Sequence, residues 1–391
     1  PPRSTLFPYT TLFRSLTSCL GCLVWLGIAG HPVPAVARPE AAETVGGVDV
    51  GGTAVSVLQH DAASGDLALN HLFRLELGRR LGPGKGVLAV WEWGRGPGLQ
   101  VQSPLGINDT VVTAPGVSLK ELAWIGKFRQ RRLCFKIGLL DLPGHTDVNG
   151  KAGDETSQFM GSMFIQSPII PFPAMAAPGI AAHHAFGDRL TLGVVVAEVG
   201  ALEGGALEGG ALEGGAMEGD GASFRHFLGL EAVFHAPGLR AGNYRVLFWH
   251  TAVAPGEEEE EADVLHTGLS FSLEQELLPV LNVFARGGLR HTPAARETFL
   301  SAGGTLAGGP WRRPDDELGL AIGGILCREQ CHGDQSHDRV WPGLLQAELY
   351  YRVALGEHWE VTPGLQWLHD RRFPESSRHL WVAQLRVKLS F

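Results

Sequence analysis

The last twelve residues of the chain, Leu380 to Phe391 (LWVAQLRVKLSF), restrict its fold more than any other stretch. Every second residue from Trp381 to Phe391 is apolar, and the residues between them are polar apart from Val382. On a β-strand this period of two creates one apolar face and one charged face. The length suits the roughly 9–11 tilted residues that cross a hydrocarbon layer. The segment is therefore the last strand of a transmembrane β-barrel or, alternatively, the last strand of a soluble sandwich.

The same alternation recurs in short segments that Gly, Pro, Asp and Asn separate. They are residues 71–78, 87–93, 133–139, 268–276, 349–355 and 359–367. Repeated signals of this kind are typical of a barrel, and a mean hydropathy near zero suits one with a wet lumen. After residue 38 no apolar stretch reaches the roughly 18 residues that a spanning helix needs. We predict an all-β fold, a closed antiparallel transmembrane β-barrel of about sixteen strands with a water-filled lumen.

The first 37 residues differ in character from the rest. Residues 5–15 (TLFPYTTLFRS) resemble a translated sequencing adapter, so we interpret residues 1–15 as an adapter-derived artefact. The apolar run 20–30 has the length of a signal-peptide core, and Ala35-Val36-Ala37 offers a small-residue cleavage site. We expect residues 16–37 to be a truncated signal peptide and residues 38–391 to form the barrel.

Several stretches read as loops. Residues 200–219 repeat the sequence GALEG and residues 257–261 are five glutamates, so both are expected to be solvated connections. The proline-rich stretch Pro168 to Pro178 cannot pair as a central strand, and we expect it to fold into the barrel or pack on its rim. Cys327 and Cys331 lie in a polar stretch, where a small disulfide, free thiols or metal binding with nearby histidines all remain open.

Composition and motifs argue against two classes of function. The net charge of −9 makes nucleic acid an unlikely partner. His183 and His184 could contribute to a catalytic triad, but the sequence contains no nucleophile elbow or comparable signature. We therefore expect a protein that is not an enzyme and has no catalytic residue, no cofactor and no metal site.

Four segments in order resemble the carbohydrate-selective porins of the OprB-like family. They are residues 147–168 after the GLLD stretch 138–141, residues 269–289 (LSFSLEQELLPVLNVFARGGL), residues 311–324 (WRRPDDELGLAIGG) and residues 345–366 (LQAELYYRVALGEHWEVTPGLQ). The resemblance covers most of residues 65–391. It departs from the family at the GALEG repeat, the glutamate run and the Cys327/Cys331 loop, and at Gly287, where the family has an aromatic residue.

The resemblance implies a channel for passive, sugar-selective diffusion into the periplasm, located in the outer membrane of a Gram-negative bacterium. The implied partners are small carbohydrates, outer-membrane lipid and the outer-membrane assembly machinery, with Phe391 as the assembly signal and a homo-oligomer as one possible state. One alternative is a structural or adhesive barrel with a plugged lumen. A less favoured alternative is an outer-membrane hydrolase.

The polar faces of the predicted strands supply the candidate pore residues, which can hydrogen-bond sugar hydroxyls or only solvate the wall. They are Arg74, Glu76, Glu274, Glu276, Arg286, Glu348, Arg352, Arg386 and Lys388, together with Trp311 in either a wet or a turn-packing role. Arg286, in the segment that resembles the family's FaR motif, is the first candidate for the constriction, facing Glu274 and Glu276. The other tryptophans on apolar faces, such as Trp359 and Trp381, are expected in an interfacial girdle.

Overall fold

The structure is a computed structural model whose described residues cover most of the chain after residue 42. The described residues are 43–45, 47–99, 108, 116–128, 132–199, 225–236, 240–253, 264–292, 296–328, 341–370 and 378–391. The predicted artefact and signal segments, the GALEG repeat and the glutamate run lie outside this set, as does Cys331. The side chain of Cys327 is also outside it, so its proposed pairing stays a prediction.

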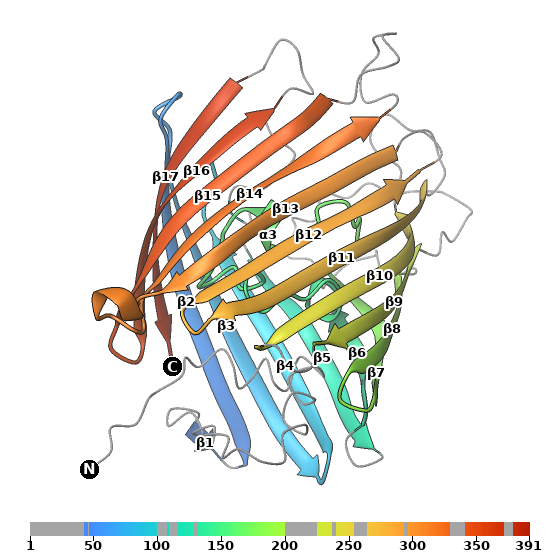
Figure 1. The fold of residues 1–391 in the computed structure, drawn as a ribbon. Coiled ribbons are helices and arrows are strands. Elements are labelled where there is room, and N and C mark those ends of the chain that lie inside the picture. Colours follow the sequence, from blue (N-terminus) through green and yellow to red (C-terminus); the bar gives the residue numbers. More distant parts are fainter. Residues whose placement is uncertain are drawn as a thin grey trace, which may run out of the picture.

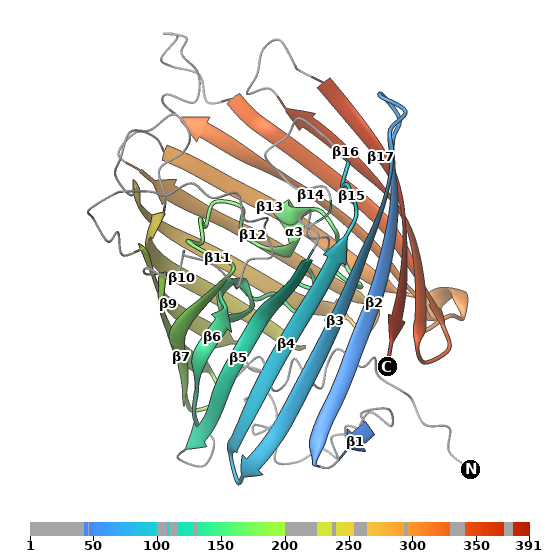
Figure 2. The same ribbon diagram turned by 180° about the vertical axis from the view of Figure 1, so that it is seen from behind.

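Sixteen antiparallel strands form a closed barrel within the described residues (Figures 1 and 2). They are β2 (Val48–Asp61), β3 (Leu67–Gly82), β4 (Lys85–Arg95), β5 (Gly116–Phe128), β6 (Leu133–Asp141), β7 (Ala176–Phe186), β8 (Leu190–Val199), β9 (Arg225–His235), β10 (Gly242–Val253), β11 (Val264–Leu278), β12 (Leu281–His291), β13 (Arg296–Ala307), β14 (Glu317–Arg328), β15 (Trp341–Leu355), β16 (Trp359–Asp370) and β17 (Arg378–Ser390). Each strand pairs with its neighbours in sequence, and β17 closes the ring on β2. The short strand β1 (Glu43–Val45) pairs with the first residues of β2. The predicted all-β barrel is confirmed.

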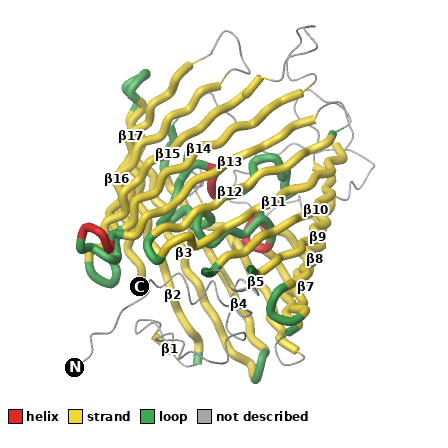
Figure 3. Tube along the Cα trace, viewed as in Figure 1, coloured by secondary structure: helices red, strands yellow, loops and turns green. Residues whose placement is uncertain are grey.

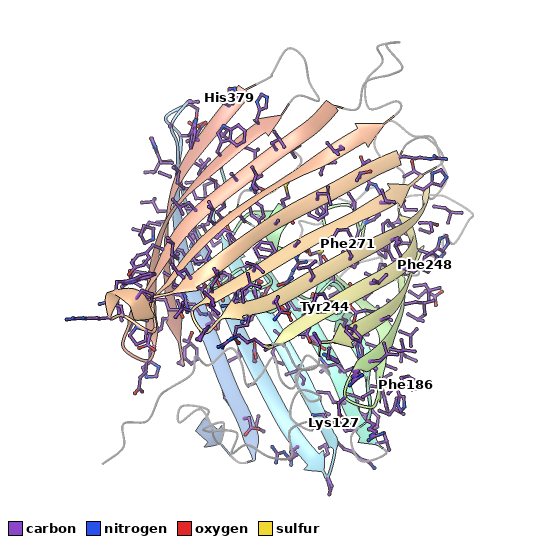
Figure 4. The ribbon with its side chains drawn as sticks, in the orientation of Figure 1. Lys127, Phe186, Tyr244, Phe248, Phe271 and His379 are labelled. Atoms are coloured by element: carbon purple, nitrogen blue, oxygen red, sulfur yellow. The ribbon has the colours of Figure 1, made fainter. Side chains whose placement is uncertain are left out.

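The alternation of the last strand has the predicted orientation. Gln384, Arg386 and Lys388 of β17 are buried on the inner side of the barrel, whereas Trp381 and Leu385 are exposed on its outer side. Figure 4 shows other outer-face residues of the same kind, among them Phe186, Phe248 and Phe271. Lipid on the outside and a polar lumen on the inside therefore account for the period of two.

The two ends of the barrel differ in the length of their connections (Figure 3). At the end where the chain terminates, β3 and β4 are joined by residues 83–84 and β11 and β12 by residues 279–280. At the opposite end, residues 142–175 separate β6 from β7 and residues 200–224 separate β8 from β9. Outer-membrane barrels have short periplasmic turns and longer extracellular loops, so the C-terminus marks the periplasmic end.

Helical structure is sparse. The described helices are α2 (Leu142–His145), α3 (Ser162–Ile165) and the 3-10 turn η3 (Gly309–Trp311). Across the part of the chain that the structure describes, we find no helix with the length and apolar character needed to cross a bilayer.

Residues 142–175, here called the internal segment, fold back between β6 and β7 into the ring of strands (Figures 1 and 2). Phe159, Met163 and Phe164 pack with Phe284 and Tyr350 of the wall, and all of these residues are buried. A second apolar cluster joins the ends of the segment to the opposite wall through Leu142, Ile170, Phe227 and Trp249.

The internal segment includes most of the proline-rich stretch, so this stretch folds into the barrel, one of the two predicted outcomes. The prediction that it cannot pair as a central strand was wrong at its end, because Pro178 lies within β7 opposite Leu139 of β6. Pro178 lies near the start of β7, and the pairing of β7 with β8 begins one residue later, at Gly179.

The terminal residue Phe391 closes the barrel with its backbone and its ring. Its N–H donates to the carbonyl of Gly52 at 3.0 Å, and the N–H of Gly52 donates to the carbonyl of Phe391 at 2.9 Å. The ring lies over Gly52, where any Cβ would overlap it, and it stacks on Phe73 at 6.0 Å between centroids. Because Gly52 has no side chain, the ring of Phe391 can lie flat on β2.

Replacing Gly52 with valine is predicted to weaken closure of the barrel. The new side chain would displace the Phe391 ring, and overpacking of this kind typically costs about 1–3 kcal/mol. The fraction of protein that migrates as a folded band on a semi-native gel, measured against temperature, reports the change. Leu58→Val on the same outer face of β2 is the matched control. Equal melting of the G52V protein and this control would contradict the role given to Gly52.

Candidate functional site

The internal segment is fixed to the barrel wall by buried polar contacts, and the first of them joins Arg286 of β12 to Asp147. One guanidinium nitrogen of Arg286, Nη1, donates to the Asp147 carboxylate at 2.6 Å and to its carbonyl at 2.9 Å. Both side chains are buried, and Arg286 has no exposed surface. Burial raises the pKa of Asp147 above its ordinary value, while Arg286 and the N–H of Ser167 oppose that rise. The contact therefore fixes the start of the segment.

A second contact lies next to it on β11. The side-chain amide of Asn149 donates to the hydroxyl of Ser272 and to the carbonyl of Leu273, each at 3.1 Å. The N–H of Gly150 donates to the buried carboxylate of Glu274, which also accepts from Arg245 on β10 at 3.4 Å. Glu274 is thus turned toward the segment, while the carboxylate in direct contact with Arg286 is that of Asp147.

Farther around the same wall, β15 holds the middle of the segment. The Glu348 carboxylate accepts hydrogen bonds from the N–H groups of Met160, at 2.9 Å and 3.1 Å, and Gly161, at 2.8 Å. The amide of Gln384 on β17 donates to the same carboxylate at 3.0 Å. A buried carboxylate that accepts several donors is well satisfied. Glu348 therefore binds the backbone of the segment directly before α3.

Strands β3 and β17 hold the stretch around Glu155. Nη2 of Arg74 donates to the Glu155 carboxylate at 2.7 Å, and Nε of Arg74 donates to Glu92 of β4 at 2.7 Å. Nη1 of Arg386 donates to the carbonyl of Glu155 at 3.0 Å, and Lys388 donates to the hydroxyl of Ser157. Arg74 and Glu155 keep 24% and 19% of their side-chain surface exposed, so they are accessible where Arg286 is not.

A further polar cluster supports α2 from strands β5 and β6. Nζ of Lys136 donates to the Glu121 carboxylate at 2.8 Å, and Nε2 of His145 lies 3.1 Å from the same oxygen. Burial and the nearby Lys136 lower the pKa of His145, although Glu121 opposes the shift. The imidazole is therefore neutral at neutral pH, and its Nε2–H donates to Glu121.

The structure places the remaining predicted residues away from the internal segment. Nη1 of Arg352 donates to Glu360 of β16 at 3.0 Å. Glu276 accepts from Arg240 at 3.0 Å in a partly exposed pair near the periplasmic end. Glu76 lies half-buried on β3 two residues beyond Arg74.

Trp311 lies in the periplasmic turn of η3. Its indole N–H donates to the hydroxyl of Tyr351 at 2.9 Å. That hydroxyl donates to Asp316 at 2.6 Å. Of the two roles considered for Trp311, this geometry matches turn packing.

Sequence reasoning alone did not identify the partners that the internal segment provides. Asp147, Asn149, Glu155 and Ser157 all lie within the stretch that carried the first family motif, residues 147–168. That motif was the signal that the sequence offered for these partners. Its residues lack the strand periodicity that would predict whether each side chain points into the lumen or away from it. Among the described residues, no group of three or more His, Cys, Asp and Glu side chains is placed to hold a metal ion.

Comparisons with known proteins agree with the fold. Residues 85–391 match the family described as carbohydrate-selective porin, OprB family. No curated protein matches the sequence. Among solved structures, OprB of Pseudomonas putida at high pH has a TM-score of 0.69 at 14% identity, with 88% of this chain and 94% of that chain covered.

Two further structures share the fold at low identity. The trimer form of OmpT from Vibrio cholerae has a TM-score of 0.57 at 7% identity, with 88% of this chain and 99% of that chain covered. The anion-selective porin from Comamonas acidovorans has a TM-score of 0.54 at 12% identity and the same coverage of each chain. At these identities the likeness to solved structures concerns the fold.

Replacing Arg286 with alanine is predicted to loosen the internal segment. Asp147 would stay buried without its partner, and breaking one side of a buried ion pair costs about 3–5 kcal/mol. We expect a barrel that still folds but has a higher single-channel conductance and a segment that proteases cleave more readily. The paired replacement R286M/D147L is expected to recover most of the stability, because it removes both charges.

The matched control is Arg240→Ala. It breaks the partly exposed Arg240–Glu276 pair, and exposed pairs contribute about 0–1 kcal/mol. If R286A and R240A have the same conductance and the same protease resistance, Arg286 does not hold the segment.

Proposed function

The chain belongs to the carbohydrate-selective porin, OprB family, and from this premise we propose that its outer-membrane channel selects uncharged sugars for passive diffusion into the periplasm. The observation that carries the proposal is the pairing of charges in the lumen. Small neutral solutes need hydrogen-bonding partners and gain nothing from a strong net field, whereas an ion-selective pore uses rings of one charge.

Several inward-facing cations at and around the internal segment have carboxylates within ion-pair distance, whereas Arg386 donates to the carbonyl of Glu155. The pairs are Arg74 with Glu92 and Glu155, Lys120 with Glu92, Lys136 with Glu121, Arg245 with Glu274, Arg286 with Asp147, Arg290 with Glu297, and Arg352 and Lys388 with Glu360. Such a lining offers fixed donors and acceptors with little net charge. It favours a polar, uncharged solute over an ion of either sign.

Within this lining we assign contact with the solute to Arg74 and Glu155. They are the partly exposed members of the anchoring network, and together they present a planar donor and a carboxylate acceptor. Arg286 is fully buried, so we give it a positioning role: it fixes Asp147 and thereby the shape of the constriction. Glu274, Glu348, Arg386 and Lys388 support the segment from the other strands.

Two other functions were considered. A structural or adhesive barrel would have a lumen plugged by the internal segment, and the apolar packing of Phe159 and Phe164 against the wall is the observation that favours it. A hydrolase would need a nucleophile beside a base, and His183 lies on the inner wall against Gly193 of the neighbouring strand. The family and fold point to a channel, and we propose that the chain is not an enzyme.

Planar-bilayer recording tests the channel and its selectivity together. Purified protein is expected to conduct with weak preference between cations and anions, and neutral sugars in the bath are expected to reduce the current. A barrel that folds but does not conduct would favour the plugged alternative. Conduction that sugars leave unchanged would contradict sugar selectivity while leaving the channel intact.

Replacing Glu155 with glutamine is predicted to shift the pore toward anions. The exchange keeps the size of the side chain but leaves Arg74 with one carboxylate partner instead of two, so the lumen gains positive charge. The zero-current potential in a salt gradient should move toward that of chloride, and sugar block should weaken. Glu357→Gln in the exposed β15–β16 turn is the matched control. A zero-current potential equal to that of the control would remove Glu155 from the conduction path.

A further inference from the structure

Histidines gather on the outer face of the barrel at its extracellular end. Seven of them share the lipid-facing side of their strands with exposed apolar residues and lie toward the extracellular strand ends. They are His60 of β2, His71 of β3, His226 of β9, His250 of β10, His291 of β12, His369 of β16 and His379 of β17, which we call the histidine girdle. Figure 4 shows His379 at this edge of the barrel.

The opposite edge has a different composition. At the periplasmic ends of the strands, the outer face presents aromatic residues. They are Phe128, Phe186, Phe234, Tyr244, Trp359 and Phe391. His184 is the outward histidine of that end within the described strands, and its ring meets Phe186 edge-on at 4.5 Å. Aromatic girdles are expected at both interfaces of such barrels, and Trp93 and Trp381 lie exposed near the extracellular end, so the histidines there are an addition to an aromatic edge that requires its own cause.

Members of the girdle lie in contact across neighbouring strands. His369 and His379 are register partners whose rings stack at 4.2 Å, and Trp367 stacks beside them. The rings of His226 and His250 are 5.2 Å apart. These pairs place imidazole rings at two sites on the circumference, on β16–β17 and on β9–β10; His369 is itself buried, so His379 is the accessible ring of its pair.

The charged neighbours of the girdle are two basic and two acidic residues. Arg95 is the register partner of His71, and Arg296 is the register partner of His291. Two acidic residues adjoin it: Glu198, the register partner of His226, and Asp61, directly after His60. Further contacts are neutral, since His71 bonds the hydroxyl of Ser56 and His250 that of Thr267, both at 2.9 Å. The edge is therefore cationic whenever the histidines are protonated.

We propose that the histidine girdle binds the phosphate groups of outer-leaflet glycolipids and that this binding strengthens as the surrounding medium becomes acidic. Protonated imidazole offers two N–H donors to a phosphate, and charge-assisted bonds of this kind are strong. Histidine is the side chain that ordinarily changes charge between about pH 5 and pH 8. Below the girdle, the exposed side chains of Leu58, Phe73, Phe248 and Leu289 form an apolar surface for acyl chains.

Binding of diphosphoryl lipid A to the full-length folded protein in detergent tests the proposal. The affinity of the wild type is expected to be roughly tenfold higher near pH 5.5 than near pH 8. Dephosphorylated lipid A is expected to show no such difference. EDTA is present throughout, so that binding through a divalent metal is excluded.

A variant in which His226, His250, His369 and His379 are all replaced by asparagine is expected to lose most of the pH dependence. H184N, which changes the outward histidine of the periplasmic end, is expected to keep it. If the fourfold variant does not fold, the two double variants, H226N/H250N and H369N/H379N, are each expected to lose part of it.

Three results would overturn the proposal. The first is wild-type affinity that does not change with pH, which would assign binding to Arg95 and Arg296. The second is an unchanged pH dependence in folded histidine variants. The third is equal binding of phosphorylated and dephosphorylated lipid A, which would leave the acyl chains as the sole contact. None of these depends on sugar transport, so they separate this proposal from that of the sugar channel.

Discussion

Closure of β17 on β2 is the constraint on which the rest of the structure depends. A strand edge exposed to hydrocarbon leaves its N–H and C=O groups without partners, so a sheet that crosses a membrane must end where it began. The last residue, Phe391, completes this pairing with Gly52 through two backbone hydrogen bonds. The absence of a side chain at Gly52 lets the Phe391 ring lie across β2 against Phe73, which extends the aromatic belt around the seam.

A closed barrel of sixteen strands encloses more space than wall side chains can fill, and the chain narrows it with its own internal segment. The segment is held from both sides: Asp147 and Gly150 contact β12 and β11, while Glu155 and Met160 contact β3, β17 and β15. Most of these contacts involve ionised groups that would be costly to bury alone. Their pairing fixes the segment and at the same time lowers the net charge of the lumen.

The outer surface of the barrel differs in composition between its two ends. Its central band is apolar because it meets acyl chains, and its two edges differ in composition. The periplasmic edge is aromatic, whereas the extracellular edge is rich in histidine. Under the proposal made above, this difference reflects the headgroups of the leaflet that surrounds each end.

The sequence by itself determined the barrel, because a period of two records directly which side of each strand meets lipid and which meets water. The terminal strand, the strand number of about sixteen and the inward direction of Arg74, Glu274, Arg286, Glu348, Arg386 and Lys388 could all be predicted from it. The partners of those residues could not, since Asp147 and Arg286 are 139 positions apart and residues 147–168 have no periodicity that assigns a direction. The tertiary structure decided that Arg286 is buried against Asp147, that Trp311 belongs to a periplasmic turn, and that Arg74 and Glu155 are the accessible pair among the contacts of the internal segment. Closure of the barrel surrounds the internal segment with strands that are far from it in the sequence. These contacts therefore depend on the tertiary structure and cannot be predicted from neighbouring positions along the chain.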